Sequence, residues 1–195
     1  MKKFIVLLTM LMVVMVCNAQ EKKDVTKFMG IPVDGTKSEM IQKLKAKGFK
    51  YFYDRDDNDY LKGEFNGNKV KIYIQTNKNK VWRVCVVEES ICDKIDIRIR
   101  FNNLYHQFEM SEKYIQSFIH VNDGTISEDE DISYEIILHN KRYEAAFFQI
   151  SENPDEPLSY MDKMVWFMIG EVNYLKYKIV IFYENLHNKY NGEDL

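Results

Sequence analysis

Residues 36–49, TKSEMIQKLKAKGF, contain the start, the body and the end of one helix. Thr36 and Glu39 have the spacing of a capping box, in which two side chains bond two backbone amides reciprocally. Lysines follow in the last turns, where they favour the negative end of the helix, and Gly48 supplies the left-handed residue after it. The apolar stripe at helical spacing consists of Met40, Ile41 and Leu44.

Beyond this helix the apolar period changes from 3.6 to 2, which predicts strands. Asn66-Gly67, between two alternating segments, is a strong hairpin signal. Upstream, residues 20–30 are polar and are interpreted as a loose leader. The predicted strands of this first half are Phe49–Tyr53, Tyr60–Phe65, Lys69–Gln75 and Val81–Glu88.

The second half repeats this order of elements. Apolar residues recur at spacings of three and four from Asp93 to about Lys113, which predicts a helix. A polar tail is expected from Asn185. The predicted strands are Ile132–His139, Arg142–Ile150, Met164–Gly170 and Leu175–Tyr183.

The sequence therefore predicts an α+β fold of two helix-plus-antiparallel-meander units. The first unit spans residues 20–90 and the second spans residues 91–195. Their sheets are expected side by side or edge to edge, within one globular body.

Residues 1–19 have the pattern of a signal peptide: two lysines, an apolar run and a cleavage site after Ala19. The run Phe4–Val16 is shorter than the roughly 20 residues that a membrane-spanning helix needs. Export to the periplasm or the cell exterior is expected. An uncleaved anchor is one alternative. Lipid attachment at Cys17, which would associate the protein with the outer membrane, is another, although Val16 is larger than the residue that usually precedes a lipidated cysteine.

Composition excludes two classes of protein. A hydrophobic content of 46% with 14% aromatic residues supports a buried core and argues against a disordered chain. The net charge of −3, with no basic stripe visible along the chain, argues against a nucleic-acid partner.

Two cysteines follow the leader, Cys85 and Cys92. An even pair in an exported protein suggests a disulfide. However, Cys85 lies within a predicted strand and Cys92 lies beyond its end, so their Cα atoms could exceed the roughly 7 Å limit for bridging. Two buried, reduced thiols are the favoured interpretation.

Metal motifs are weak. The four histidines are far apart, with no zinc spacing. The acidic loop supplies Asp54, Asp56 and Asn58 as calcium-ligand candidates. It departs from an EF-hand afterwards, because Asp59 stands where glycine is needed and Phe65 where glutamate is needed. A non-EF calcium site that stabilises a surface module stays a hypothesis.

Motifs for nucleophilic catalysis and phosphate binding are absent from the sequence, so no cofactor is expected. A glycan or peptide hydrolase with a carboxylate pair is the alternative function, because such a pair is formed by the fold and not by sequence spacing.

Aromatic residues are concentrated in the strands. Alternation in Val81–Glu88 places Trp82 and Arg83 on opposite faces of that strand, and both faces are largely apolar. The strand is therefore either central and covered on both sides or part of a binding patch. The candidates for a partner surface are Tyr73, Trp82 and Arg83.

Four segments carry a family resemblance: FMGIPVDGTKSEMIQKLKAKGF (28–49), FNGNKVKIYI (65–74), VWRVCVVEE (81–89) and YKIVIFYENLHN (177–188). They resemble small exported proteins of Bacteroides-type bacteria. The repeated helix-and-meander pattern is similar to β-lactamase-inhibitor-protein-like domains and to BamE-type assembly lipoproteins.

This resemblance implies a non-catalytic binding or scaffold protein, with a protein or cell-envelope ligand as partner. It carries over no site residue, because the chain matches no family site motif.

Overall fold

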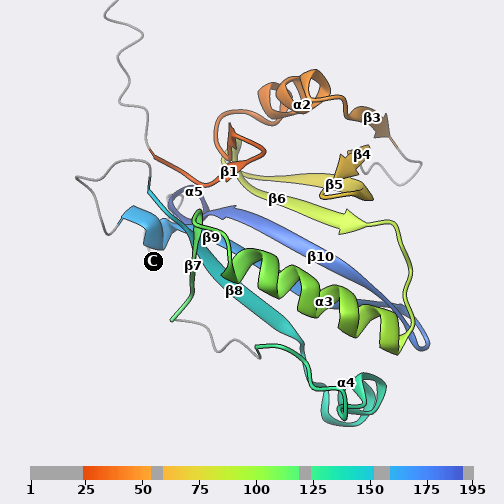
Figure 1. Cartoon of the computed structure of the whole chain (residues 1–195). Coiled ribbons are helices and arrows are strands. Elements are labelled where there is room, and N and C mark those ends of the chain that lie inside the picture. The colour runs from red at the N-terminus through yellow and green to blue at the C-terminus, as the bar shows by residue number, and fades with distance from the viewer. Residues whose placement is uncertain (1–23, 54–58, 119–123, 152–158, 191–195) are drawn as a thin grey trace, which may run out of the picture.

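The structure is a computed structural model that describes residues 24–53, 59–118, 124–151 and 159–190. The predicted α+β class with antiparallel strands is confirmed (Figure 1). The elements are, in order, β1 (Lys27–Phe28), β2 (Ile31–Pro32), α2 (Lys37–Ala46), β3 (Lys50–Tyr53), β4 (Asp59–Phe65), β5 (Asn68–Asn77), β6 (Lys80–Glu88), α3 (Lys94–Glu109), β7 (Tyr114–Gln116), α4 (Ile132–His139), β8 (Glu144–Gln149), the 3-10 helix η1 (Ser159–Asp162), β9 (Lys163–Asn173), β10 (Lys176–Asn185) and α5 (Leu186–Tyr190).

Eight strands form one antiparallel sheet in the order β3-β4-β5-β6-β10-β9-β8-β7. The first four are consecutive in the chain, and so are the last four. The two groups meet where β6 pairs with β10, with Val86 opposite Ile181 and Cys85 opposite Phe182. The strands of both halves of the chain therefore form one continuous sheet.

Helices α2 and α3 pack on one face of this sheet (Figure 1). Phe101 of α3 lies 5.0 Å from the Phe167 ring of β9, measured between ring centroids. Met40 and Leu44 of α2 belong to the same buried cluster as Ile72 of β5. One core thus extends under both helices. None of the helices within the described ranges is long and apolar enough to span a membrane.

The capping box of α2 is confirmed. The Thr36 hydroxyl accepts a hydrogen bond from the Glu39 amide at 3.3 Å, and a Glu39 carboxylate oxygen accepts one from the Thr36 amide at 2.8 Å. The Glu39 carboxylate accepts hydrogen bonds from both the amide and the hydroxyl of Thr36, which stabilise its ionised form and lower the pKa of Glu39. The start of the helix is therefore fixed by local chemistry, as its sequence predicts.

The strand predicted at Ile132–His139 is wrong, because this segment is helix α4. The Asp131 side chain accepts hydrogen bonds from the amides of Ser133 and Tyr134 and caps the first turn. Asn140 adopts the left-handed conformation that ends the helix, with φ of 52°. Capping at both ends thus outweighs the β propensity of the isoleucines between them.

Two segments expected to be loose are packed. The described part of the leader, residues 24–30, contains β1, which pairs with β2 and has Phe28 fully buried. At the other end, Asn185 is buried in β10 and donates a hydrogen bond to the Val33 carbonyl at 2.9 Å, and α5 follows it. Both segments contribute hydrogen bonds or apolar surface to distant strands, which their own composition does not reveal.

The predicted signal peptide, residues 1–19 with Cys17, lies outside the described residues. Its cleavage and lipidation therefore stay predictions.

Candidate functional site

The sheet face opposite α2 and α3 is called the open face here. Directly opposed residues of antiparallel strands point to the same face. Tyr73 of β5 opposes Cys85, which in turn opposes Phe182 of β10. Phe182 opposes Trp166 of β9, and their rings stack with centroids 4.1 Å apart. The open face thus carries a row of mainly aromatic side chains that crosses the junction between β6 and β10.

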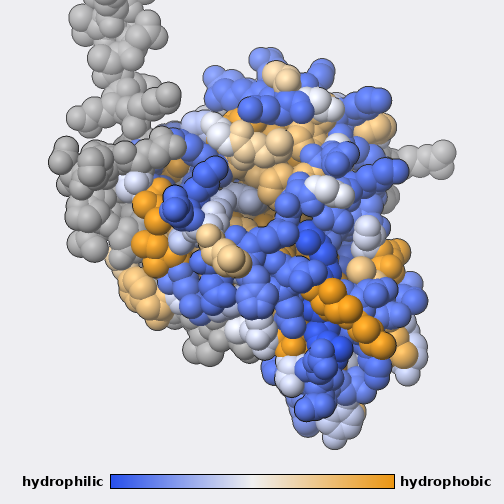
Figure 2. All heavy atoms as spheres, in the orientation of Figure 1, coloured by the Kyte–Doolittle hydropathy of each residue, from blue (hydrophilic) through white to orange (hydrophobic). Residues whose placement is uncertain are grey.

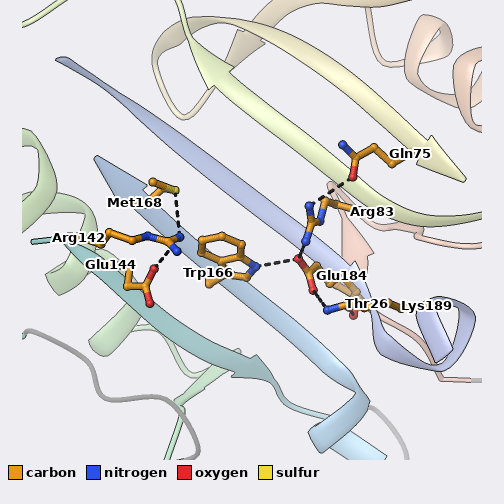
Figure 3. A network of polar contacts seen from close by, with 9 residues as sticks. All are labelled: Thr26, Gln75, Arg83, Arg142, Glu144, Trp166, Met168, Glu184 and Lys189. Atoms are coloured by element: carbon orange, nitrogen blue, oxygen red, sulfur yellow. Dashed lines mark hydrogen bonds and ion pairs between the residues drawn. The ribbon is translucent and has the colours of Figure 1, made fainter. Parts of the chain in front are cut away.

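A buried carboxylate lies beside this row (Figure 3). The Glu184 side chain is 1% exposed and forms an ion pair with Arg83 at 2.5 Å. Trp166 donates its indole hydrogen to the same carboxylate oxygen, Oε1, at 2.9 Å. The ammonium group of Lys189 lies 3.8 Å from Oε2, which accepts no hydrogen bond from the described residues.

This network fixes the orientation of the aromatic groups around it. The Arg83 guanidinium lies 4.1 Å from the Trp82 ring centroid and 5.0 Å from that of Phe182. A cation at these distances is attracted to the ring face. Because Glu184 holds the guanidinium and the indole at once, these side chains form one rigid polar and aromatic surface.

The three predicted partner-surface residues lie at this side of the sheet. Tyr73 and Arg83 belong to the open face, through their pairs with Cys85 and Gln75. The alternation expected for Trp82 is wrong, because the β5–β6 register shifts between Gln75 and Thr76. Because of this irregularity, the Trp82 ring lies next to the Arg83 guanidinium instead of on the other face of the strand.

Sequence reasoning missed Glu184, Trp166 and Phe182. Alternation within β10 does place Phe182 and Glu184 on one side, which is a usable signal. The pairing of β10 with β6, which brings these residues to Arg83, has no local signal in either strand.

Cys85 and Cys92 are both free, as the favoured interpretation predicts, but only Cys85 is buried and Cys92 is partly exposed. Burial raises the pKa of the Cys85 thiol to about 11. Burial also raises the pKa of Cys92, with Asp96 and Glu88 contributing. Thiols with raised pKa values are poor nucleophiles at neutral pH, so neither cysteine has the environment of a catalytic thiolate.

We expect Cys85 to resist alkylation by iodoacetamide at pH 8 in the folded protein. Its thiolate forms only as the pH approaches the raised pKa of about 11, whereas an ordinary thiol ionises near 9.0. Peptide mapping by mass spectrometry distinguishes it from the other two cysteines of the chain. Labelling in denaturant is the control, and rapid labelling of Cys85 in the folded protein would contradict the structure.

A concave region lies apart from the open face, between the start of α3, helix α4 and the β9–β10 turn. It has a volume of about 840 Å³. Figure 2 shows hydrophobic atoms gathered over this end of α3, where Ile95 and Ile99 are exposed. The residues that line it are Asp93, Lys94, Ile95, Asp131, Ser133, Tyr134, Ile137, Leu138, Tyr174, Leu175 and Lys176.

The two carboxylates that line this concave region, Asp93 and Asp131, cap the first turns of α3 and α4. Asp93 accepts hydrogen bonds from the Asp96 and Ile95 amides, which lower its pKa. Asp131 caps α4 and accepts from Lys94 at 2.8 Å, and the latter bond is the main cause of its lowered pKa. A general acid requires a raised pKa, so neither carboxylate suits the acid role of a hydrolase.

The predicted calcium ligands Asp54, Asp56 and Asn58 lie outside the described residues. Their neighbour Asp59 forms an ion pair with Lys37 and accepts a hydrogen bond from the Tyr51 hydroxyl at 3.4 Å. Within the described ranges, no group of three or more histidine, cysteine or acidic residues is arranged to hold a metal ion.

Comparison of the chain with protein-family models, with curated proteins and with solved structures finds no match. The geometry of the open face is therefore the basis for a functional assignment.

Proposed function

We propose that this protein is an exported, non-catalytic binding protein that recognises a protein or cell-envelope ligand through its open face. The row formed by Tyr73, Cys85, Phe182 and Trp166 carries this proposal. Apart from Cys85, which is nearly buried, these side chains are partly exposed although they are largely apolar, and neither α2 nor α3 covers them. Partly exposed aromatic residues next to an arginine are the composition of binding hot spots.

The rigidity of this surface supports the same conclusion. Glu184 is joined to Arg83 by an ion pair and to Trp166 by a hydrogen bond, so these side chains lose little freedom when a ligand binds. A preorganised surface binds more tightly than a flexible one of equal area.

The strand order supports a further part of the proposal, that the chain consists of two related units, residues 20–90 and 91–195. In each, a helix precedes four strands, which α4 and η1 interrupt in the second unit, and the last strands, β6 and β10, pair with each other. Tandem units of this kind would agree with the resemblance to β-lactamase-inhibitor-protein-like and BamE-type domains. The open face would then combine surface from both units.

Site-specific photo-cross-linking in the native envelope tests the open face. A photoreactive amino acid replaces Tyr73 or Phe182, and matched controls carry it at Met110 or Tyr174, which are 83% and 78% exposed. We expect a reproducible adduct, identified by mass spectrometry, from the two open-face positions and none from the controls. Equal adducts at all four positions, or none at the open-face positions, would overturn the proposal.

A further inference from the structure

The aromatic side chains of the open face continue from Tyr73 towards the sheet edge. Phe52 of β3 opposes Tyr60 of β4, with ring centroids 5.7 Å apart and planes inclined by 15°. The Tyr60 ring lies 5.8 Å from that of Tyr73. Phe52 is 39% exposed. Phe52, Tyr60 and Tyr73 are called the aromatic row.

A row of lysines runs beside it on the same three strands. Lys50 directly opposes Lys62, and Lys62 directly opposes Lys71. These three residues are called the lysine row. Like charges in direct cross-strand pairs destabilise a sheet. Of the carboxylates that the structure describes, only Glu89 forms an ion pair with this row, 3.1 Å from Lys62.

The two rows contact each other. The Lys62 ammonium lies 5.7 Å from the Phe52 ring centroid and 5.9 Å from that of Tyr60. The Lys71 ammonium lies 5.3 Å from the Tyr60 centroid. The charges therefore lean over the rings, and a ligand that rests on the aromatic row meets them directly.

Resting on the proposed function, we propose that the aromatic and lysine rows bind an acidic polysaccharide. The C–H faces of sugar rings are apolar and pack on aromatic rings, while a uronate or sulfate group pairs with the lysines and relieves their mutual repulsion. Each row crosses three strands, a span of about 10 Å at the usual strand spacing. That length suits a segment of an oligosaccharide better than a single sugar.

The small number of lysines argues against a single-stranded nucleic acid as the ligand. Nucleic-acid binding draws its affinity from many phosphate contacts. Here the row offers three lysines, one already paired with Glu89, on a chain of net charge −3. Phosphate contacts alone would therefore give a nucleic acid little affinity for this surface.

Affinity electrophoresis of the full chain tests this inference. The probes are polygalacturonate, its methyl-esterified form, which has the same rings without the charge, and an oligo-dT strand. We expect retardation by polygalacturonate that weakens with added salt, and much weaker retardation by the ester. Stronger retardation by oligo-dT, or equal retardation by the ester, would overturn the proposal.

Variants locate the binding site. Lys50→Gln and Lys71→Gln are each expected to weaken polygalacturonate binding roughly two- to fivefold, the worth of an exposed ion pair. Phe52→Ala is expected to weaken it roughly two- to tenfold. The matched controls, Lys45→Gln on α2 and Tyr174→Ala at the β9–β10 turn, should bind as the unaltered protein does. Equal losses in controls and open-face variants would contradict the assignment.

The two proposals can fail separately. Cross-links from Tyr73 and Phe182 without retardation by polygalacturonate would remove the acidic glycan and leave the open face as a binding surface. Retardation that no open-face variant weakens would place the glycan elsewhere and overturn this inference.

Discussion

Replacing Phe167 with alanine is expected to lower the free energy of unfolding by about 3–5 kcal/mol, the usual cost of removing a buried phenylalanine. Phe167 is fully buried in β9, and its ring centroid lies 5.0 Å from that of Phe101 and 5.6 Å from that of Phe108. Both partners belong to α3, so the cavity would open between helix and sheet. Urea unfolding followed by tryptophan fluorescence measures the loss.

Phe118→Ala is the matched control, because Phe118 is 66% exposed. We expect its effect to stay within about 0.5 kcal/mol, as for most surface substitutions. Phe167→Leu should lie between the two, since leucine refills part of the cavity. A loss at Phe167→Ala no larger than that at Phe118→Ala would show that α3 does not pack on β9 as described.

The second large effect is expected from Arg83→Met, at about 3–5 kcal/mol of unfolding free energy. The substitution leaves Glu184, with a side chain 1% exposed, without its nearest cation. The Lys189 ammonium lies 3.8 Å from the Glu184 carboxylate, so it replaces only part of the lost ion pair. Removing one partner of a buried pair costs more than the pair itself contributes, because the remaining charge stays desolvated.

The double variant Arg83→Met/Glu184→Met separates this cause from lost packing. It is expected to be more stable than Arg83→Met alone, because it leaves no unpaired carboxylate. The control is Arg142→Met, which removes a more exposed ion pair to Glu144, 3.2 Å long, and should cost about 0–1 kcal/mol. A double variant less stable than Arg83→Met would contradict a desolvated charge at Glu184.

Helix α4 is a segment whose sequence predicts the wrong element, a strand. Helices α2 and α3 follow from apolar stripes at helical spacing, and α2 also from its cap at Thr36, whereas the cap of α3 at Asp93 is seen only in the structure. Ile132–His139 has the composition of a strand, but the capping residues Asp131 and Asn140 make it a helix. Local hydrogen bonds at the ends decide such a short segment more than the propensity of its middle.

The site was partly visible in the sequence. Tyr73 and Arg83 were candidates because they lie in strands rich in aromatic residues, and alternation within β6 placed Arg83 on the same face as Cys85. Trp82 was misplaced because the register shift next to it interrupts the period of two. Lys50, Lys62 and Lys71 come from three strands, and their alignment is a property of register rather than of any one segment.

By itself, the sequence determined the elements whose signals lie within a few residues of one another: the capped helices, the Asn66-Gly67 hairpin and the alternating strands. The tertiary structure alone decided that β6 pairs with β10, and with it the meeting of Arg83, Glu184 and Trp166. The Thr26 hydroxyl donates a hydrogen bond to the Glu184 carbonyl, which is 158 residues away in the sequence. Such partners are selected by burial and shape over the whole fold, because a strand edge presents the same backbone groups to every candidate neighbour.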